Sequence, residues 1–341
     1  MCDALPNYQQ WENGPKVVAV GGGTGLSTML RGLKQYTKNL TAIVTVADDG
    51  GGSGMLRREM GMLPPGDIRH CMESLANVEP IMEKLLTYRF KDGLLSGQCF
   101  GNLLLAALNG ITGSFEEAVE QMSQVLAITG RVIPVTAADV QLEAVFENGS
   151  RVVGESSIFS FKKEQDCRIA RVGLIPEHPK ALPAALKAIA DADLILLGPG
   201  SLYTSIIPNL LVDGVVDAIC HSRALKIYVC NIMTQDGETE GYTAADHVEA
   251  LLAHGAPGMV DVCLANSEAV RPGLLERYRK EDSAPLIVDR ERFVRMGLEL
   301  AQLPVADPAG HYARHSASRL TEAIMSIYRQ HAGRVRYIVE E

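Results

Sequence analysis

The sequence lacks the long apolar segments and the excess of positive charge that several protein classes require. No hydrophobic run approaches the roughly 20 residues of a membrane-spanning helix, so we expect no membrane insertion. Residues 1–16 are polar and lack the apolar core of a signal peptide, which favours a cytoplasmic protein. The 32 Lys and Arg are outnumbered by 41 Asp and Glu, giving a formal net charge of -9. Because an acidic chain gains little from counterion release, we expect no nucleic-acid partner.

Several metal-binding and catalytic signatures are missing as well. The seven cysteines include no C-x-x-C spacing, which argues against a zinc site or a disulfide framework and for reduced thiols. Neither H-E-x-x-H nor G-x-S-x-G occurs. His311 and His315 could share a helix face, but without a third ligand nearby we interpret them as a surface pair. The remaining composition, 47% hydrophobic and 21% charged, is that of an ordinary globular protein.

Short apolar runs alternate with helical patterns along most of the chain. The runs are short and rich in β-branched residues, which is typical of buried parallel strands. We predict strands at 17–20, 43–46, 194–197, 227–230 and 260–264, with a short edge strand at 287–288. We predict helices at 26–33, over most of 68–130 (with a helix buried on all sides at 103–108), and at 316–328. This rhythm predicts a Rossmann-like α/β fold, with a mostly parallel sheet and helices on both faces.

The pattern changes between residues 136 and 173. Apolar residues at 140, 142, 144 and 146 alternate with polar ones, and Asn148-Gly149 follows, which indicates an antiparallel hairpin. Apolar residues at 152, 158, 159, 169 and 172 continue this β pattern. We therefore predict one domain over 16–330 with a small antiparallel β insertion, a loosely packed tail over 1–15 and a C-terminal extension over 331–341.

A glycine-rich loop follows the first predicted strand. Glycines allow backbone N–H groups to approach a phosphate, and the start of the next helix favours an anion. The loop fits neither the dinucleotide fingerprint G-x-G-x-x-G nor a P-loop. We favour anion binding over a simple tight turn. The candidate ligand-binding residues here are Gly22, Gly23, Thr24, Gly25 and Leu26.

Two carboxylates and another run of glycines follow the second predicted strand. Asp48 or Asp49 could hold a ribose hydroxyl, as in Rossmann-type sites, or a Mg²⁺ ion beside substrate phosphates. Ser53 lies in the same loop. The alternative is a surface loop whose aspartates cap a helix. That alternative explains one aspartate but not the composition of the whole loop.

A third cluster combines prolines, Asp67 and Arg69 ahead of a predicted helix. Asp67 could cap this helix. Arg69 falls in the first turn, where a cation is unfavourable unless a bound phosphate compensates. A surface Arg paired with a neighbour explains Arg69 equally well. Asn102 precedes the apolar helix and is a candidate ligand residue, although an N-cap is the simpler interpretation.

Two further loops follow later strands. The first offers Gly198, Gly200, Ser201, Thr204 and Ser205. The second, residues 231–243, is a polar and lid-like loop that offers Asn231, Thr234 and Tyr242. Four of the loops follow parallel-type strands, so they should open on one edge of the sheet, where ligands of open α/β sheets bind.

Together these motifs resemble the gluconeogenesis factor family (YvcK-type proteins), which is related to 2-phospho-L-lactate transferase (CofD-like). The resemblance covers about residues 16–330. The stretches that carry it are VAVGGGTG at 18–25, ADDGGGSG at 47–54, PGDIR at 65–69, GNL at 101–103, LGPGSLYTSIIP at 197–208, and residues 231–243.

The resemblance implies a cytoplasmic bacterial protein. One branch of the family is associated with cell shape and cell-wall maintenance on gluconeogenic carbon sources, and with binding of UDP-sugars such as UDP-N-acetylglucosamine. The transferase branch uses Mg²⁺ to move a phospholactyl group from a nucleotide carrier, and Asp48 or Asp49 would match its metal or catalytic aspartate. The family often carries His just before Gly101-Asn102, where this chain has Gln98, which weakens the case for catalysis.

Our leading hypothesis is therefore a regulatory protein that binds a nucleotide sugar. A Mg²⁺-dependent transferase of nucleotide-linked substrates is the first alternative, and an NAD-binding protein is the second. Mg²⁺ is the one cofactor that the motifs suggest. The sequence leaves open the base and the sugar of the ligand, whether any reaction is catalysed, and whether the chain forms a homo-oligomer.

Overall fold

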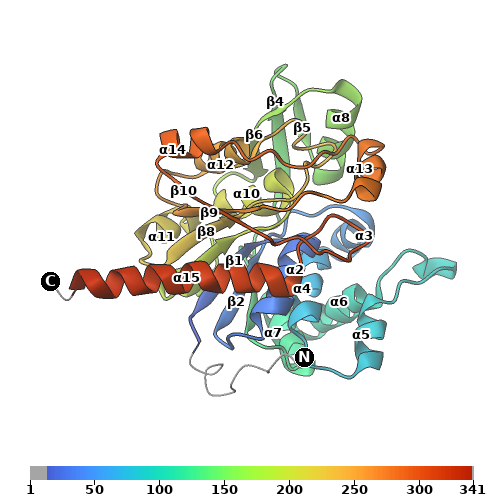
Figure 1. Ribbon diagram of the computed structural model, residues 1–341. Helices are drawn as coiled ribbons and strands as arrows, with labels where there is room; N and C mark the ends of the chain where they lie inside the picture. Colours follow the sequence, from blue (N-terminus) through green and yellow to red (C-terminus); the bar gives the residue numbers. More distant parts are fainter. Residues whose placement is uncertain (1–13, 340–341) are drawn as a thin grey trace.

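A seven-stranded parallel sheet forms the centre of the structure, a computed structural model that describes residues 14–339 and the side chains of 14–332 (Figure 1). The strand order is β10-β9-β8-β7-β1-β2-β3, and every neighbouring pair is parallel. The strands are β1 (Val17–Gly21), β2 (Leu40–Val44), β3 (Arg131–Pro134), β7 (Leu194–Leu197), β8 (Leu225–Val229), β9 (Val262–Asn266) and β10 (Glu299–Leu303).

Helices cover both faces of this sheet, so its central strands are buried (Figure 1). One group of helices that pack together consists of α2 (Gly23–Leu33), α4 (Gly66–Leu75) and α15 (Ala317–Val339). A second comprises α9 (Pro183–Ala190), α10 (Ile207–Leu210), α11 (Val215–His221) and α12 (Ala244–His254). All residues of β1 and β7 are buried, which explains their unbroken apolar sequence. The predicted Rossmann-like fold is confirmed.

The small antiparallel sheet is also confirmed, in the order β5-β4-β6, but it contains a helix that the sequence did not predict. Its strands are β4 (Gln141–Phe146), β5 (Arg151–Val153) and β6 (Ile169–Ile175). Between β5 and β6 lies α8 (Glu155–Gln165). The prediction that Ile158 and Phe159 continue the β pattern is therefore wrong, since both lie in α8.

The remaining helices differ from the predictions in detail. They are α3 (Gly51–Met60), α5 (Pro80–Thr87), α6 (Phe100–Thr112), α7 (Phe115–Val125), α13 (Pro272–Arg279) and α14 (Arg290–Met296). The helix at 103–108 belongs to α6, but it is not buried on all sides, because Ala107 and Ile111 are exposed. The edge strand is β10 rather than 287–288, where Ile287 makes only an isolated bridge to Thr243.

Both ends of the chain were predicted to lie outside the domain. Residues 1–13 and 340–341 lie outside the described residues, so most of the predicted tail cannot be compared. The terminal helix α15 runs to Val339, well past the predicted end at 328. Among the helices of residues 14–339, none is long and apolar enough to cross a membrane.

The direction of the strand order reverses between β1 and β7. From β1 the chain proceeds outward to β2 and β3, whereas from β7 it proceeds the other way to β8, β9 and β10. At such a reversal, ligands bind in the crevice outside the carboxyl ends of the strands. The fold therefore directs attention to the loops after β1 and β7.

Candidate functional site

The loops that follow β1 and β7 lie in direct contact. A Cβ atom added to Gly25 would lie 2.7 Å from the carbonyl oxygen of Pro199, and one added to Gly200 would lie 3.1 Å from that of Gly22. Contacts this close leave no room for a side chain at Gly25. The two turns therefore share one rim of the sheet, as their positions after parallel strands predicted.

A cavity of about 550 Å³ opens at this rim. Its size lies within the range that encloses a nucleotide-sized ligand. The predicted residues that line it are Gly22, Gly23, Thr24, Gly25, Gly200, Ser201, Ser205, Asn231 and Thr234. The remaining lining residues, of which Pro199 and those at 232–236 belong to the predicted loops, are Thr28, Phe159, Pro199, Ile232, Met233, Gln235, Asp236, Tyr278, Glu281, Ser283, Ala313, Arg314 and His315.

Helix α2 begins at this cavity with glycine at its N-cap. Gly22 supplies no side-chain cap and the first turn contains no acidic residue, but the carboxyl of Asp67 accepts a hydrogen bond from the amide of Gly23. The free N–H groups of a helix start carry partial positive charge and favour an anion. Helix α3 also has glycine at its N-cap, Gly50, whose amide donates to Asp48. Both glycine-rich loops thus end in helix starts that lie beside a carboxyl group.

Two other helical segments at the same edge are capped by carboxylates of the chain itself. The first is the π-helical segment η2 (Leu202–Ile206), which continues into α10. The Glu238 carboxylate accepts hydrogen bonds from the amides of Tyr203 and Thr204 at 2.9 and 3.0 Å. Burial raises the pKa of Glu238 to about 7. The amide of Thr204, a predicted ligand residue, is therefore already occupied.

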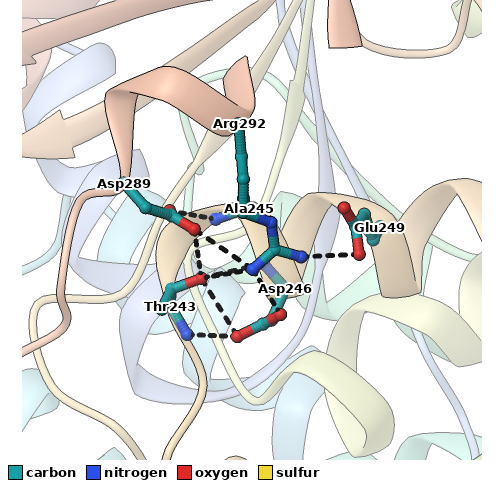
Figure 2. Close-up of polar contacts among 6 residues, drawn as sticks. All are labelled: Thr243, Ala245, Asp246, Glu249, Asp289 and Arg292. Atoms are coloured by element: carbon teal, nitrogen blue, oxygen red, sulfur yellow. Dashed lines mark hydrogen bonds and ion pairs between the residues drawn. The ribbon is translucent and has the colours of Figure 1, made fainter. Parts of the chain in front are cut away.

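Helix α12 is the second capped start, shown in Figure 2. Thr243 and Asp246 form a reciprocal capping box. Asp289 accepts from the amide of Ala245 at 3.1 Å. The guanidinium of Arg292 lies between Asp246, at 2.8 Å, and Asp289, at 3.1 Å (Figure 2). These interactions fix α14 to the start of α12 and leave no free site for an anion there.

The 231–243 loop is tied to the loop after β7 along its length, which differs from the predicted lid. Asn231 donates to the carbonyl of Gly200 at 2.9 Å. The hydroxyl of Ser201 donates to Gln235 at 2.8 Å. Farther along, Tyr242 shares a hydrogen bond of 2.9 Å with the hydroxyl of Tyr203, which places it away from the cavity. These bonds make the two loops one wall of the site.

A cluster of carboxyl groups lies beside the starts of α2 and α3. Burial, followed by the nearby Asp48, raises the pKa of Asp67 to about 7. Burial and then Asp48 likewise raise the pKa of Glu155 to about 8. Burial raises the pKa of Asp48 itself, despite a hydrogen bond of 2.8 Å from the Gly50 amide. Such a group holds protons at neutral pH or requires a neighbouring cation.

The other predicted carboxylates take roles different from those expected. Asp49 accepts from the amide and the hydroxyl of Ser156, at 3.0 and 2.7 Å, and so holds the start of α8. Asp67 lies in the first turn of α4 but makes no capping bond. Asp48 does not line the cavity, so its geometry does not support the predicted contact with a ribose, in a nucleotide sugar or in NAD. Ser53 is buried and bonds to Asp48.

Arg69 is buried in a network of its own instead of facing a phosphate. Its guanidinium donates to Asn102 at 2.7 Å, pairs with Glu73, and lies 2.7 Å from His70. Asn102 lies inside α6, whose N-cap is Cys99, so the N-cap interpretation is wrong. Leu26 is fully buried as well, and Gly198 and Thr204 lie outside the cavity lining. These residues support the site from behind.

No preformed metal centre is seen in the part of the chain that the structure describes. Within it, no three His, Cys, Asp or Glu side chains are grouped so that they could hold an ion. Mg²⁺ commonly uses one or two carboxylates together with substrate phosphates. Asp49 accepts from Ser156 through Oδ1, and a metal role for the pair Asp48 and Asp49 stays a prediction.

Four side chains of the cavity come from segments that carry no glycine signature. Phe159 comes from α8, Tyr278 from α13, and Arg314 and His315 from the segment before α15. His315 bonds to the Cys230 carbonyl at 3.2 Å, and burial lowers its pKa to about 4, so it is neutral. The predicted surface pair with His311 on a helix is wrong, since neither lies in a helix. Arg314 adds a cation to the wall of the cavity.

Known proteins with similar sequences agree on one family. The family model described as 2-phospho-L-lactate transferase CofD matches residues 17–306. A putative gluconeogenesis factor from Thermoanaerobacterium thermosulfurigenes is 55% identical over 315 residues, which is 92% of this chain and 97% of that protein. The gluconeogenesis factor of Bacillus subtilis is 45% identical over 317 residues, covering 93% and 99%.

Solved structures agree with the sequence comparisons. A crystal structure of a protein from Bacillus halodurans superimposes with a TM-score of 0.87 at 45% sequence identity. The match covers 91% of this chain and 99% of that one. The similarity therefore extends over the parallel sheet, the β insertion and the loops that form the cavity.

Proposed function

Since this chain belongs to the gluconeogenesis factor family, within the wider 2-phospho-L-lactate transferase CofD family, we propose that it is a cytoplasmic regulatory protein that binds a nucleotide sugar. The ligand is of the UDP-N-acetylglucosamine type, and the protein supports cell shape and cell-wall maintenance during growth on gluconeogenic carbon sources. The observation that carries the proposal is the glycine-rich start of α2, which lines a cavity large enough for the whole ligand.

The polarity of the cavity supports a diphosphate at its centre. The amides of residues 22–25 and the close turn at Gly200 surround one end of the cavity, where an anion gains most from the helix start. Arg314 supplies a positive charge in a protein whose net charge is negative. Asn231, Thr234 and Ser201 offer amide and hydroxyl groups for the sugar and ribose hydroxyls. Because Glu238 occupies the start of η2, the diphosphate belongs at α2 alone.

Calorimetry with UDP-N-acetylglucosamine tests the binding proposal. We expect saturable binding in the micromolar range, with UDP bound more weakly and N-acetylglucosamine alone not bound. The titration is run with and without Mg²⁺, because the carboxyl cluster beside α2 would repel a diphosphate unless a proton or cation intervenes. Absence of heat at millimolar ligand under both conditions would remove the proposal.

A genetic experiment tests the cellular role. The chain is expressed in a Bacillus subtilis strain that lacks its own gluconeogenesis factor, which is 45% identical. We expect normal growth and rod shape on a gluconeogenic carbon source to be restored. A variant that folds but does not bind the nucleotide sugar shows whether the cellular role requires ligand binding. If that variant restored growth and shape fully, the proposed link between the ligand and cell shape would be contradicted.

The carboxyl cluster favours a second candidate, a Mg²⁺-dependent transferase. Asp48, Asp67 and Glu155 have raised pKa values because each is partly removed from solvent, and all three lie near the α2 and α3 starts. A cation there would stabilise their ionised forms and a leaving diphosphate together. Asp48→Asn and Asp49→Asn should then abolish turnover while affinity stays within about tenfold. Equal loss of turnover and affinity would count against a catalytic role.

A further inference from the structure

Helix α8 of the β insertion directs one of its faces toward the edge of the sheet where the cavity lies. Glu155, Phe159 and Lys162 are spaced by four and three residues, which places them on the same face of a helix. Glu155 is half-buried in the carboxyl cluster, and Lys162 is buried against Glu240 at 3.1 Å. Phe159 lies between them and lines the cavity. The β insertion therefore reaches the site through this one helix face.

Phe159 is a large apolar side chain that is 43% exposed and lines the cavity. Its ring rests on the backbone of Gly237, where a Cβ atom would lie 2.5 Å from Cδ2 of the ring. Gly237 has a φ of +76°, a conformation that also favours glycine. One side of the ring is thus seated on the 231–243 loop.

The helix that carries Phe159 is held at several points. Asp49 binds the start of α8 through Ser156. Lys163 pairs with Asp236 at 2.8 Å, and Lys162 pairs with Glu240. These contacts come from two loops at the carboxyl edge of the sheet, the loop after β2 and the loop after β8. An aromatic ring fixed in this way loses little conformational freedom when a ligand packs against it.

The polar neighbours of Phe159 in the cavity indicate which part of the ligand it meets. Gln235 and Asp236 precede the glycine under the ring, and both line the cavity. Asp236 already pairs with Lys163, and the oxygen of Gln235 accepts from Ser201, but a carboxylate has further acceptor positions and an amide has donors, so both can still bond to hydroxyls. The Arg314 side chain, which suits phosphate, comes from the segment before α15 and not from this wall. The wall formed by Phe159, Gln235 and Asp236 therefore fits a hydroxyl-bearing ring.

We propose that Phe159 is a specificity-determining residue whose ring packs against the apolar face of the ligand's hexosamine, while Gln235 and Asp236 take its hydroxyls. The proposal rests on the proposed function, and it states that the β insertion contacts the sugar of the ligand. It makes α8 the element through which a bound sugar, and not the nucleotide, contacts the insertion.

The test compares two ligands in calorimetric titrations of the full chain. Phe159→Ala should weaken UDP-N-acetylglucosamine by about tenfold, because an aromatic contact and its buried area are lost, and should leave UDP within about twofold. Phe159→Tyr should retain the wild-type affinity for both. The control is Tyr88→Ala, a change at a similarly exposed aromatic (48%) outside the cavity, with no effect on either ligand.

The outcomes separate this proposal from the proposed function. If wild type binds UDP-N-acetylglucosamine and Phe159→Ala binds it equally well, the specificity assignment is overturned and the function stands. Equal weakening of UDP and the UDP-sugar also overturns it, because the ring then acts on the nucleotide or on the fold. If wild type binds neither ligand, both proposals fall.

A fluorescence measurement gives an independent readout that does not depend on affinity. The sequence contains a single tryptophan, Trp11, so Trp11→Phe combined with Phe159→Trp yields a protein with one reporter in α8. We expect UDP-N-acetylglucosamine to change its emission and UDP to leave it unchanged at saturation. An identical change with both ligands would contradict a contact with the sugar.

Discussion

Four helical starts lie at the same edge of this protein, and they fall into two kinds. Helices α2 and α3 begin at glycines with no side-chain cap. The segment η2 and helix α12 begin against carboxylates of the chain, from Glu238 in one case and from Asp246 and Asp289 in the other. All four begin in loops at the carboxyl edge of the sheet. At α2 the carboxyl of Asp67 accepts from the amide of Gly23, and the next residues of the first turn, Thr24 and Gly25, line the cavity.

The difference shows how the same backbone feature serves two purposes. A helix start attracts negative charge whatever its source. Where the chain supplies the charge, the start becomes a rigid joint, as Arg292 shows by tying α12 to α14 (Figure 2). Where the chain supplies glycine, the start stays available to a phosphate. The capped starts hold the walls of the cavity, and the uncapped start of α2 faces its interior.

The largest expected effect is at the uncapped start. In Gly25→Ala the new Cβ would lie 2.7 Å from the Pro199 carbonyl oxygen, so the two loops must separate and the α2 amides must shift. We expect binding of UDP-N-acetylglucosamine to weaken by about 100-fold, which corresponds to about 2.7 kcal/mol. Titration calorimetry measures this change directly.

Gly110→Ala is the matched control for that substitution. Gly110 lies in α6, and nothing lies within 4 Å of an added Cβ there. Affinity should be unchanged and the free energy of unfolding should rise by about 0.5–1 kcal/mol, the helix-propensity gain. If Gly25→Ala bound the ligand as tightly as Gly110→Ala does, the close approach of the two loops would have no role in binding.

The second effect concerns pH, since raised pKa values occur at both kinds of start. Burial raises the pKa of Glu155 to about 8 and those of Asp67 and Glu238 to about 7. The folded protein keeps these protons above the pH at which the unfolded chain, with ordinary carboxyl values near 4, has lost them. The stability of the ligand-free protein must therefore fall as the pH rises between those limits.

Calorimetric melting at about pH 6 and about pH 8.5 tests this dependence. We expect a loss of about 2 kcal/mol, which lowers the melting temperature by roughly 4–8 °C. Glu155→Gln should flatten the slope most, because Glu155 has the highest pKa of the three, and Glu238→Gln should flatten it less. A melting temperature that is constant or rises over this interval would show that the carboxyl groups are not protonated in the folded state.

The sequence predicted the uncapped starts better than the capped ones. A glycine-rich turn between a buried strand and a helix is a local signal, and the loops after β1, β2 and β7 were found from it. The cap at η2 has no local signal, because Glu238 lies 35 residues after Tyr203 and meets it only in the folded chain. The same reason hides Phe159, Tyr278 and Arg314, which reach the cavity through tertiary packing.

Helix α8 was missed for a related reason. Its sequence contains Ile158, Phe159 and Phe161 between serines, which is as compatible with a strand as with a helix. The cap that starts it is Asp49, 107 residues earlier in the chain, so no capping residue precedes the helix. The observed surroundings of Asp48 and Arg69 also differ from the predicted ones. The burial of these side chains, and the pairing of Arg69 with Glu73, depend on the whole fold.

A third and smaller effect is expected at the capped starts. Thr243→Ala removes the capping hydroxyl of α12 and a partner of both Asp289 and Arg292. Loss of an N-cap costs about 1–2 kcal/mol, so the melting temperature should fall by roughly 2–8 °C while affinity stays within about twofold. Ser114→Ala, at the N-cap of α7, is the control and should cost less, because Ser114 makes only one capping bond. Loss of affinity in Thr243→Ala alone would mean that the capped start also shapes the ligand site.

The smallest effect is expected at Lys163, on the solvent side of α8. Its side chain is 56% exposed and pairs with Asp236, and its ammonium lies 6.0 Å from the centre of the Phe159 ring. Exposed ion pairs contribute little, so Lys163→Ala should change the melting temperature by no more than about 1 °C. Binding of UDP-N-acetylglucosamine should stay within about twofold, since α8 remains fixed by Asp49 and by the buried Lys162. A tenfold loss for the UDP-sugar with no loss for UDP would assign the sugar contact to the charge of Lys163 and not to the aromatic ring beside it.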